Sequence, residues 1–250
     1  MRSARAWGWL IVASISACGD SAATPDAPLG IDANFNAKSG TVIDDQTSEP
    51  IANANVCLLD QTAIPCSITD SSGVWELEVP PSTTDQDLTI LTTANGYLGD
   101  VFLVQNTPTG FSIFAGTAMR SDVHAMTLLA TQAQFTYPDT TRGFIRAILF
   151  DNIDGATATI APASGSGPIY TDPNGVPNPS RTSTSIDGTI YFGNVTPGPF
   201  TLTVTAPGKT CSVVGNGLPP VGAWPPIDGS TARGRVISGA ITDEVRIHCD

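Results

Sequence analysis

Residues 69–79 read TDSSGVWELEV, and residues 184–192, much later in the chain, read TSIDGTIYF. Each stretch predicts a β-hairpin, because Asp and Ser bond their own backbone in a turn and Gly supplies the positive φ that a tight turn needs. Beyond each turn hydrophobic residues recur at every second position, as in a strand with one buried face. These residues are Trp75, Leu77 and Val79 in the first stretch and Ile190 and Phe192 in the second. The repeat predicts one β-unit that is used twice.

The composition also favours a turn-rich β protein. The 250 residues include 24 Gly and 20 Pro, and only 14% of them are charged. The formal net charge of −12 gives an acidic surface, which repels phosphate backbones and anionic lipid headgroups. We therefore exclude nucleic acid as a partner and interpret the acidity as a source of solubility.

The N-terminus has the layout of a bacterial lipoprotein signal peptide over residues 1–17. A short basic start precedes an apolar run at residues 6–15, which is too short to span a bilayer as a stable helix. The run ends in ISAC at residues 15–18, which resembles the lipobox, in which the cysteine is diacylated before cleavage. We expect Cys18 to begin the mature chain, with acyl chains that anchor it to a membrane. The alternative is an ordinary signal peptide followed by a chance cysteine.

The anchor sets the expected location of the protein. Gly19, and not Asp, follows Cys18, so the aspartate signal for retention at the inner membrane of enteric bacteria is missing. We expect a lipid-anchored protein of the bacterial cell envelope, held at the outer membrane on its periplasmic face or at the cell surface. Residues 18–37 show little periodicity and many Asp, Ala, Pro and Asn residues, which predicts a flexible tether after the lipidated cysteine.

Four cysteines remain beyond the lipobox, and an even number in an exported protein favours disulfides. Four cysteines allow three pairings. We expect the pairs Cys57–Cys66 and Cys211–Cys249, because each pair then stays inside one predicted domain. The first pair would close a short loop between strands, and the second would staple the end of the chain to an earlier strand.

Residues 38–110 resemble the carboxypeptidase regulatory-like domain. The resemblance is carried by GTVID at 40–44, PI at 50–51, ANVCL at 54–58, TDSSGVWEL at 69–77 and GY at 96–97. The departures from the family pattern are Asn53 in place of Gly and Trp75 in place of Tyr or Phe. The resemblance implies a small prealbumin-like β-sandwich and implies no activity.

Residues 140–250 repeat the same order of segments. The matching segments are GFIRAILFD at 143–151, GATATI at 155–160 and the hairpin around residues 187–188. This copy keeps the Gly-Ala pair that the first copy lacks. It also carries an insertion at residues 162–180, rich in Ser, Gly, Pro and Asn. The resemblance therefore extends to a second domain of the same kind.

The connector at residues 111–139 is the exception to the β pattern. Ser121 is placed to N-cap a short helix there. Spacings of three, four and three residues predict one helical face, made of Val123, Met126, Ala130 and Ala133. The predicted fold is therefore all-β: two tandem prealbumin-like or Ig-like β-sandwich domains, at residues 38–110 and 140–250, joined by a short helix-containing connector.

No residue set with catalytic spacing stands out, so we expect no enzyme, no catalytic residues and no cofactor. The chain has two histidines, His124 in the connector, which we expect to face solvent, and His248 in the last strand. No CxxC pair and no Gly-x-Ser-x-Gly motif occurs, which argues against a zinc site and a serine hydrolase. The enzyme alternative needs a site between the domains that gathers either histidine with carboxylates or tyrosines.

Two further ligand sites are weighed against plainer interpretations. Asp151, Asn152 and Asp154 cluster oxygen ligands that suit Ca²⁺, but their spacing does not match an EF-hand, and a plain turn explains them. We therefore predict no metal site. Trp224 and Tyr170 lie in Pro- and Gly-rich loops and are the aromatic residues best suited to contact a ligand.

The sequence thus predicts a non-enzymatic, lipid-anchored cell-envelope protein that acts as a spacer or protein-interaction module. Its expected partners are the membrane, through the lipid, and another envelope protein. The alternative is a carbohydrate-binding surface lipoprotein. That alternative has a glycan as its partner and requires Trp224 and Tyr170 to be exposed together.

Overall fold

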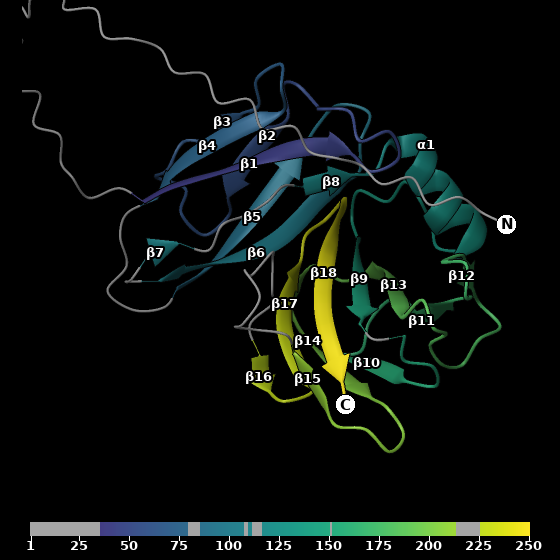
Figure 1. Ribbon diagram of the computed structural model, residues 1–250. Helices are drawn as coiled ribbons and strands as arrows, with labels where there is room; N and C mark the ends of the chain where they lie inside the picture. Colours follow the sequence, from purple (N-terminus) through teal and green to yellow (C-terminus); the bar gives the residue numbers. More distant parts are fainter. Residues whose placement is uncertain (1–35, 80–85, 108–109, 112–116, 151, 214–225) are drawn as a thin grey trace, which may run out of the picture. The chain divides into compact units, whose positions relative to one another are not determined.

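The computed structural model describes residues 36–79, 86–107, 110–111, 117–150, 152–213 and 226–250 (Figure 1). Asn34–Asp250 forms one compact unit. Cys18, the predicted signal peptide, Asp151 and Trp224 lie outside the described residues, as does most of the predicted tether. The described chain is almost entirely strands and loops, which confirms the all-β fold class.

The first half of the described chain forms two facing sheets, called here the first sandwich. One sheet has the order β4-β1-β8, and in the other β3, β2, β5 and β6 lie side by side. The strands are β1 (Asn36–Asp44), β2 (Asn55–Leu58), β3 (Ser67–Ile68), β4 (Val74–Val79), β5 (Gln86–Thr93), β6 (Gly99–Thr107), β7 (Gly110–Phe111) and β8 (Thr117–Met119). Strand β1 pairs antiparallel with β4 and parallel with β8.

The core of the first sandwich follows the predicted alternation. Strand β4 buries Trp75, Leu77 and Val79 and exposes the residues between them. Side chains of β2, β5, β6 and β8 close the core from both sheets, among them Val56, Leu58, Leu88, Ile90, Phe102 and Met119. Burial of these apolar side chains is the main force that holds the two sheets together.

The second half forms a second sandwich with the same pairing scheme. Strand β9 pairs antiparallel with β13 and parallel with β18, while β14 lies between β10 and β17. The strands are β9 (Gly143–Leu149), β10 (Thr157–Ala161), β11 (Ser166–Thr171), β12 (Pro177–Asn178), β13 (Thr189–Val195), β14 (Gly198–Thr205), β15 (Cys211–Val213), β16 (Pro226–Asp228), β17 (Thr231–Val236) and β18 (Ala240–Cys249). Ile190 and Phe192 are buried in its core, as predicted.

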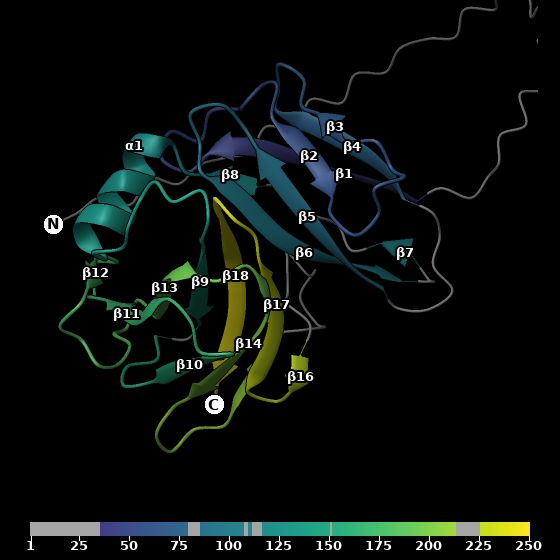
Figure 2. The same ribbon diagram turned by 180° about the vertical axis from the view of Figure 1, so that it is seen from behind.

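The predicted insertion at residues 162–180 adds two strands to the second sandwich. Strand β11 pairs antiparallel with β13, with Ile169 opposite Tyr191 and Tyr170 opposite Ile190. Strand β12 then pairs with β11 at the end of the sheet (Figure 2). The insertion therefore covers the edge of β13 that faces away from β9.

Strand β18 joins the two sandwiches. It pairs in parallel with β9 on one side and with β6 of the first sandwich on the other, where Ile241 lies opposite Asp100. The result is one continuous sheet of 11 strands that runs from one sandwich into the other (Figure 1). The domain boundaries at residues 38–110 and 140–250 stay a prediction.

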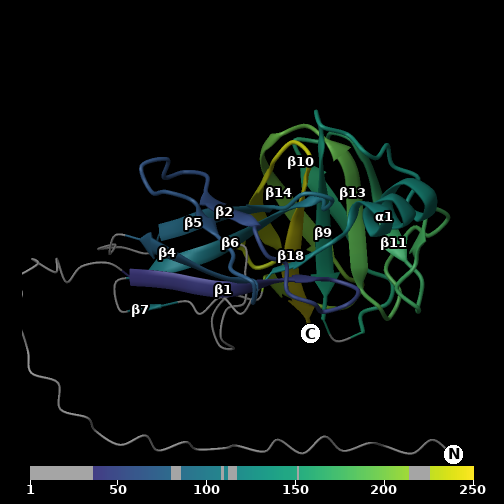
Figure 3. The ribbon, with the colours of Figure 1, turned by 90° about the horizontal axis from the view of Figure 1, so that it is seen from above.

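The connector contains the predicted helix, as α1 (Asp122–Ala125) continued by the wider turns of η1 (Met126–Gln132) (Figure 3). The Ser121 side chain accepts a hydrogen bond from the His124 backbone N–H, which confirms the N-cap. The predicted face is wrong at its start, because Val123 and Met126 are 78% and 51% exposed, whereas Ala133 is buried as predicted. The buried face instead packs on outward side chains of β9 and β13 and consists of Ala125, Leu128, Leu129 and Ala133.

Candidate interaction site and buried charge cluster

A cluster of charged side chains lies where β18 joins the sandwiches. Asp243 accepts hydrogen bonds from two arginines: Nη1 of Arg120 lies 2.9 Å from Oδ2, and Nη1 of Arg146 lies 3.0 Å from Oδ2 and 3.1 Å from Oδ1. The side chains of Arg120 and Asp243 are only 3% and 8% exposed. Oδ2 of Asp45, in the turn after β1, lies 3.8 Å from Nε of Arg120. The cluster connects the corner after β8 to β9 and β18.

The electrostatics of this cluster favour a structural role. Burial alone would lower the pKa of Arg120, but Asp243 and the other acidic groups around it, among them Asp45 and Asp100, together hold the pKa above its ordinary value. Burial raises the pKa of the neighbouring Tyr191, so its hydroxyl stays neutral. Removing a buried carboxylate that two guanidinium groups share destabilises a protein strongly, because it leaves buried positive charge uncompensated.

The two histidines occupy different elements. His124 is not turned to solvent as predicted: its side chain is 20% exposed, and Nδ1 lies 3.5 Å from Oδ2 of Asp45. Burial lowers the pKa of His124, although Asp45 pulls it the other way. His248 pairs with Asp250 at the end of β18. The prediction for His124 failed because its partner lies far away in sequence, in the turn after β1.

The loop weighed as a calcium site offers few ligands in the described residues. Asp154 is paired with Arg181, whose Nη2 lies 3.3 Å from Oδ1. Asn152 is exposed and has a φ of 54°, which is typical of a turn. Within the described ranges, no group of three or more His, Cys, Asp or Glu residues is placed to hold a metal ion.

Tyr170 is not the exposed aromatic that a glycan site requires. Its side chain belongs to the core of the second sandwich, where the residue is 3% exposed. Its hydroxyl accepts a hydrogen bond of 3.1 Å from the backbone N–H of Ala158, and burial raises its pKa. The prediction was wrong because the insertion is not a free loop: β11 pairs with β13 and turns Tyr170 inward. Trp224 lies outside the described residues.

Both predicted disulfides are present. Cys211 and Cys249 lie opposite each other in the pairing of β15 with β18, with Cα atoms 3.9 Å apart. Cys57, in β2, is bonded to Cys66, with Cα atoms 4.4 Å apart. The second of these bonds closes the loop between β2 and β3 and holds it beside β4.

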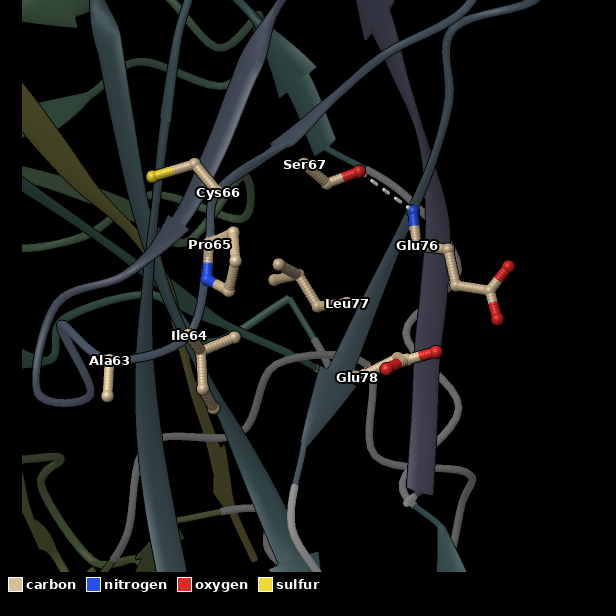
Figure 4. Close-up of a pocket in the computed structure, with 8 residues that line it drawn as sticks. All are labelled: Ala63, Ile64, Pro65, Cys66, Ser67, Glu76, Leu77 and Glu78. Carbon is tan, nitrogen blue, oxygen red and sulfur yellow. Dashed lines mark hydrogen bonds between the residues drawn. The ribbon is translucent and has the colours of Figure 1, made fainter. Parts of the chain in front are cut away.

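A surface depression of about 700 Å³ lies between that loop and β4 (Figure 4). Its lining residues come from two short segments: Ala63, Ile64, Pro65, Cys66 and Ser67 from the loop, and Glu76, Leu77 and Glu78 from β4. Leu77 points toward the loop, while Glu76 and Glu78 point away from it over β1 (Figure 4). We call this depression the β4 groove. It has an apolar floor and an acidic outer strand.

The β4 groove runs along a strand edge. Among the described strands, β4 pairs with β1 and ends its sheet. The Glu76 backbone N–H donates to Oγ of Ser67 at 3.1 Å, so it points away from β1. Because backbone groups of successive residues point to alternate sides, the N–H and C=O of Glu78 point the same way. The edge therefore presents hydrogen-bonding groups to the groove.

Neither the groove nor the charge cluster was predicted from the sequence. The groove had one usable signal: residues 162–180 form an insertion that the first copy lacks, and no described strand covers the equivalent edge of the first copy. The cluster had none, because Arg120 and Asp243 lie 123 residues apart and single charged residues in strands have no characteristic spacing.

Comparisons with known proteins add little. No protein-family model and no curated protein matches the chain. Among solved structures it is similar to the TIE protein of Bacillus anthracis (14% identity, TM-score 0.28, 87% of this chain and 34% of that one). It is also similar to GBS52, the minor pilin of Streptococcus agalactiae (9% identity, TM-score 0.25, 85% and 95%), and to a double mutant of the shaft pilin SpaA of Lactobacillus rhamnosus GG (11% identity, TM-score 0.24, 86% and 98%). The chain spans about a third of the first of these proteins. Likenesses at these scores define neither fold nor function.

In the part of the chain that the structure describes, no helix combines the length and the apolar composition needed to cross a membrane.

Proposed function

We propose that this protein is a non-enzymatic spacer or protein-interaction module of the bacterial cell envelope, held to a membrane by a lipid on Cys18. The observation that carries the proposal is the joint, in which β18 lies between β9 and β6 and gives the two sandwiches a common sheet. A carrier built in this way keeps the loops and strand edges of one sandwich at a fixed distance from those of the other. That is the property a spacer or surface module requires.

The two alternatives have weaker support. An enzyme would have to use His124, whose neighbouring carboxylate Asp45 also lies near Arg120, or His248, which pairs with Asp250 at the end of β18. A glycan-binding protein would have to do without Tyr170, whose ring is part of the core. The interaction module requires neither residue.

The anchor is tested by intact mass spectrometry of the protein purified from membranes, beside a Cys18→Ala variant. We expect a lipid mass increment on the wild type that the variant lacks, with no free thiol among the four remaining cysteines. Outer-membrane location is checked by separating the two membranes on a density gradient. A protein that is cleaved elsewhere and recovered without lipid would refute the anchor.

The carrier is tested by distance measurement between spin labels at Ile68 and Ile186, which are 64% and 53% exposed in the first and second sandwich. We expect a single narrow distance distribution in the full chain. A broad distribution would mean that the sandwiches swing independently, and the module would then not act as a spacer.

A further inference from the structure

The second sandwich contains an example of a strand bound at the edge that no described strand of the first sandwich covers. The hairpins align through their glycines, because the carbonyl of Gly73 accepts from the Val42 N–H at 2.8 Å and that of Gly188 accepts from the Leu149 N–H at 3.0 Å. Counting onward from these glycines, Glu76 and Glu78 occupy the positions of Tyr191 and Gly193. Strand β11 pairs with β13 at these two positions, placing Ile169 opposite Tyr191 and Ser166 opposite Gly193.

The β4 groove leaves room for an equivalent strand. Among the described residues, Asp70 bonds the N–H and C=O of Val74 at the start of this edge, and Oγ of Ser67 accepts from the Glu76 N–H. Beyond that bond, the open space of the groove borders Glu78 and Leu77 on one side and Ile64 and Pro65 on the other. A strand laid along β4 would alternate, with one row of side chains over the apolar floor and the other beside the glutamates.

The charge of Glu76 and Glu78 indicates which kind of segment the β4 groove binds. A second copy of this chain, paired edge to edge, would set Glu76 and Glu78 against the same residues, and like charges opposite each other destabilise a strand pair. The chain's own residues 18–35 include Asp20, Asp26 and Asp32 and no Lys or Arg, so they are repelled as well. A segment whose outward side chains are Lys or Arg is attracted by both glutamates.

We propose that the outer edge of β4 binds an extended segment of a partner protein, in which basic residues alternate with apolar ones. The segment pairs antiparallel to β4, as β11 does to β13, with its basic side chains beside Glu76 and Glu78 and its apolar side chains over Leu77 and Ile64. This inference rests on the proposed role as an interaction module and names the partner's chemistry. The glutamates then serve recognition, beyond the common use of charges to keep an edge strand from aggregating.

The probe is a fluorescein-labelled, acetylated hexapeptide of alternating Lys and Val, titrated with the full chain in detergent and followed by fluorescence anisotropy. Two matched peptides serve as controls: one with Glu in place of Lys, and one with N-methylated amides at alternate residues, which keeps the charge but cannot form the ladder. We expect binding of the Lys peptide alone. Methylation should weaken binding by more than about tenfold, because a strand needs its backbone hydrogen bonds.

Three variants locate the site. E76Q/E78Q should weaken binding of the Lys peptide by about tenfold through loss of two cross-strand charge pairs. D154N/D250N removes the same charge from exposed positions elsewhere and should change nothing. Glu78→Pro removes an N–H that points away from β1 and should abolish binding while Glu78→Gln keeps most of it. Thermal melting shows whether each variant is folded, and if the proline variant is not, the methylated peptide still decides.

The outcomes separate this inference from the proposed function. Absence of Lys-peptide binding at millimolar concentration, equal binding of the methylated peptide, or equal binding by E76Q/E78Q would overturn strand docking at β4. Aggregation of E76Q/E78Q without peptide binding would mean that the glutamates only guard the edge, which also overturns it. In each case, a lipidated Cys18 and a narrow distance between the spin labels would leave the interaction module standing.

Discussion

The two sandwiches share a hairpin whose hydrogen bonds repeat from one copy to the other. In the first, Oγ1 of Thr69 donates to the carbonyl of Ile51 at 2.7 Å and accepts from the Ala54 N–H at 2.8 Å. In the second, Thr184 makes the same two bonds with the equivalent residues, at 2.6 and 2.9 Å. Both threonines are almost completely buried. The repeated unit has kept the bonds that fix its turn to the opposite sheet.

The sandwiches differ at their edges. Strand β13 is covered by β11, whereas the equivalent β4 borders an open groove with a disulfide-bonded loop as its far wall. Strand β18 is flanked on both sides, by β9 and β6, whereas the equivalent β8 pairs with β1 alone among the described strands. The two copies therefore share their turns and cores and differ in which strands pair at their edges.

Removing the carboxylate of the charge cluster at the joint should cause the largest loss of stability. Asp243→Ala leaves Arg120 and Arg146 without their shared carboxylate, and we expect the free energy of unfolding to fall by about 3–5 kcal/mol. Because the joint ties both sandwiches together, the distance distribution between spin labels at Ile68 and Ile186 should also broaden. Chemical denaturation and the distance measurement check the two effects.

Asp154→Ala is the matched control for the joint. It removes the carboxylate of an ion pair with Arg181, but Asp154 is 69% exposed, and such pairs contribute about 0.5 kcal/mol or less. Equal losses for the two variants would mean that the buried cluster is no stronger than a surface ion pair, and that the shared sheet alone holds the sandwiches together.

The next largest difference between the sandwiches should be the stability that each gains from its disulfide. Cys57–Cys66 closes 9 residues and Cys211–Cys249 closes 38, and a longer closed loop restrains the unfolded chain more. We expect paired Ser substitutions to destabilise the protein by about 2.5 kcal/mol at the first site and about 4 kcal/mol at the second. Denaturant titration of both variants measures the difference. A larger loss at Cys57–Cys66 would show that this bond acts on the folded loop beside the β4 groove.

The buried threonines test how alike the two hairpins are. Thr69→Val and Thr184→Val each leave a backbone N–H and a backbone carbonyl without the side-chain partner, at a cost of about 1–3 kcal/mol. The losses should agree within about 0.5 kcal/mol, because the bonds agree in geometry. Thr→Ser at either position keeps the hydroxyl and should restore most of the stability. Unequal losses would mean that one turn is held by other contacts.

Much of the fold could be predicted because its signals are local. The two hairpins were readable from turn residues and from alternation at every second position, which is how Trp75 and Ile190 were placed in the cores. The disulfide pairs followed once two domains were assumed. Ser121 was readable as an N-cap because that preference depends on the residue and its immediate neighbours.

The features that failed depend on contacts over long sequence distances or on unusual helix geometry. The pairing of β6 with β18 has no counterpart in local spacing. The predicted helical face assumed 3.6 residues per turn, but η1 has wider turns, in which the Ala133 N–H bonds the carbonyl of Leu128, five residues back. The wider turns change which residues of η1 share a face, so Leu128 and Leu129 are buried and Met126 is exposed, while Val123 lies in α1, before these turns, on the side turned to solvent.

The smallest effect on stability is expected at an equivalent position in the two copies where one has Asn and the other has Gly. Asn53 has a φ of 59° and Gly155 a φ of 82°, and the N–H of each donates to the carbonyl of the equivalent threonine at 3.0 Å. Asn is among the residues that adopt this left-handed region most readily, and a Cβ at Gly155 would meet nothing within 4 Å. Asn53→Gly and Gly155→Asn should therefore each change the free energy of unfolding by about 0.5 kcal/mol or less. Gly155→Val, which is β-branched, should cost about 1–2 kcal/mol at the same site through its backbone alone. Thermal and denaturant unfolding of the three variants resolves these differences, and a loss above about 1 kcal/mol for Asn53→Gly would mean that the Asn53 side chain makes a contribution that the glycine of the second copy lacks.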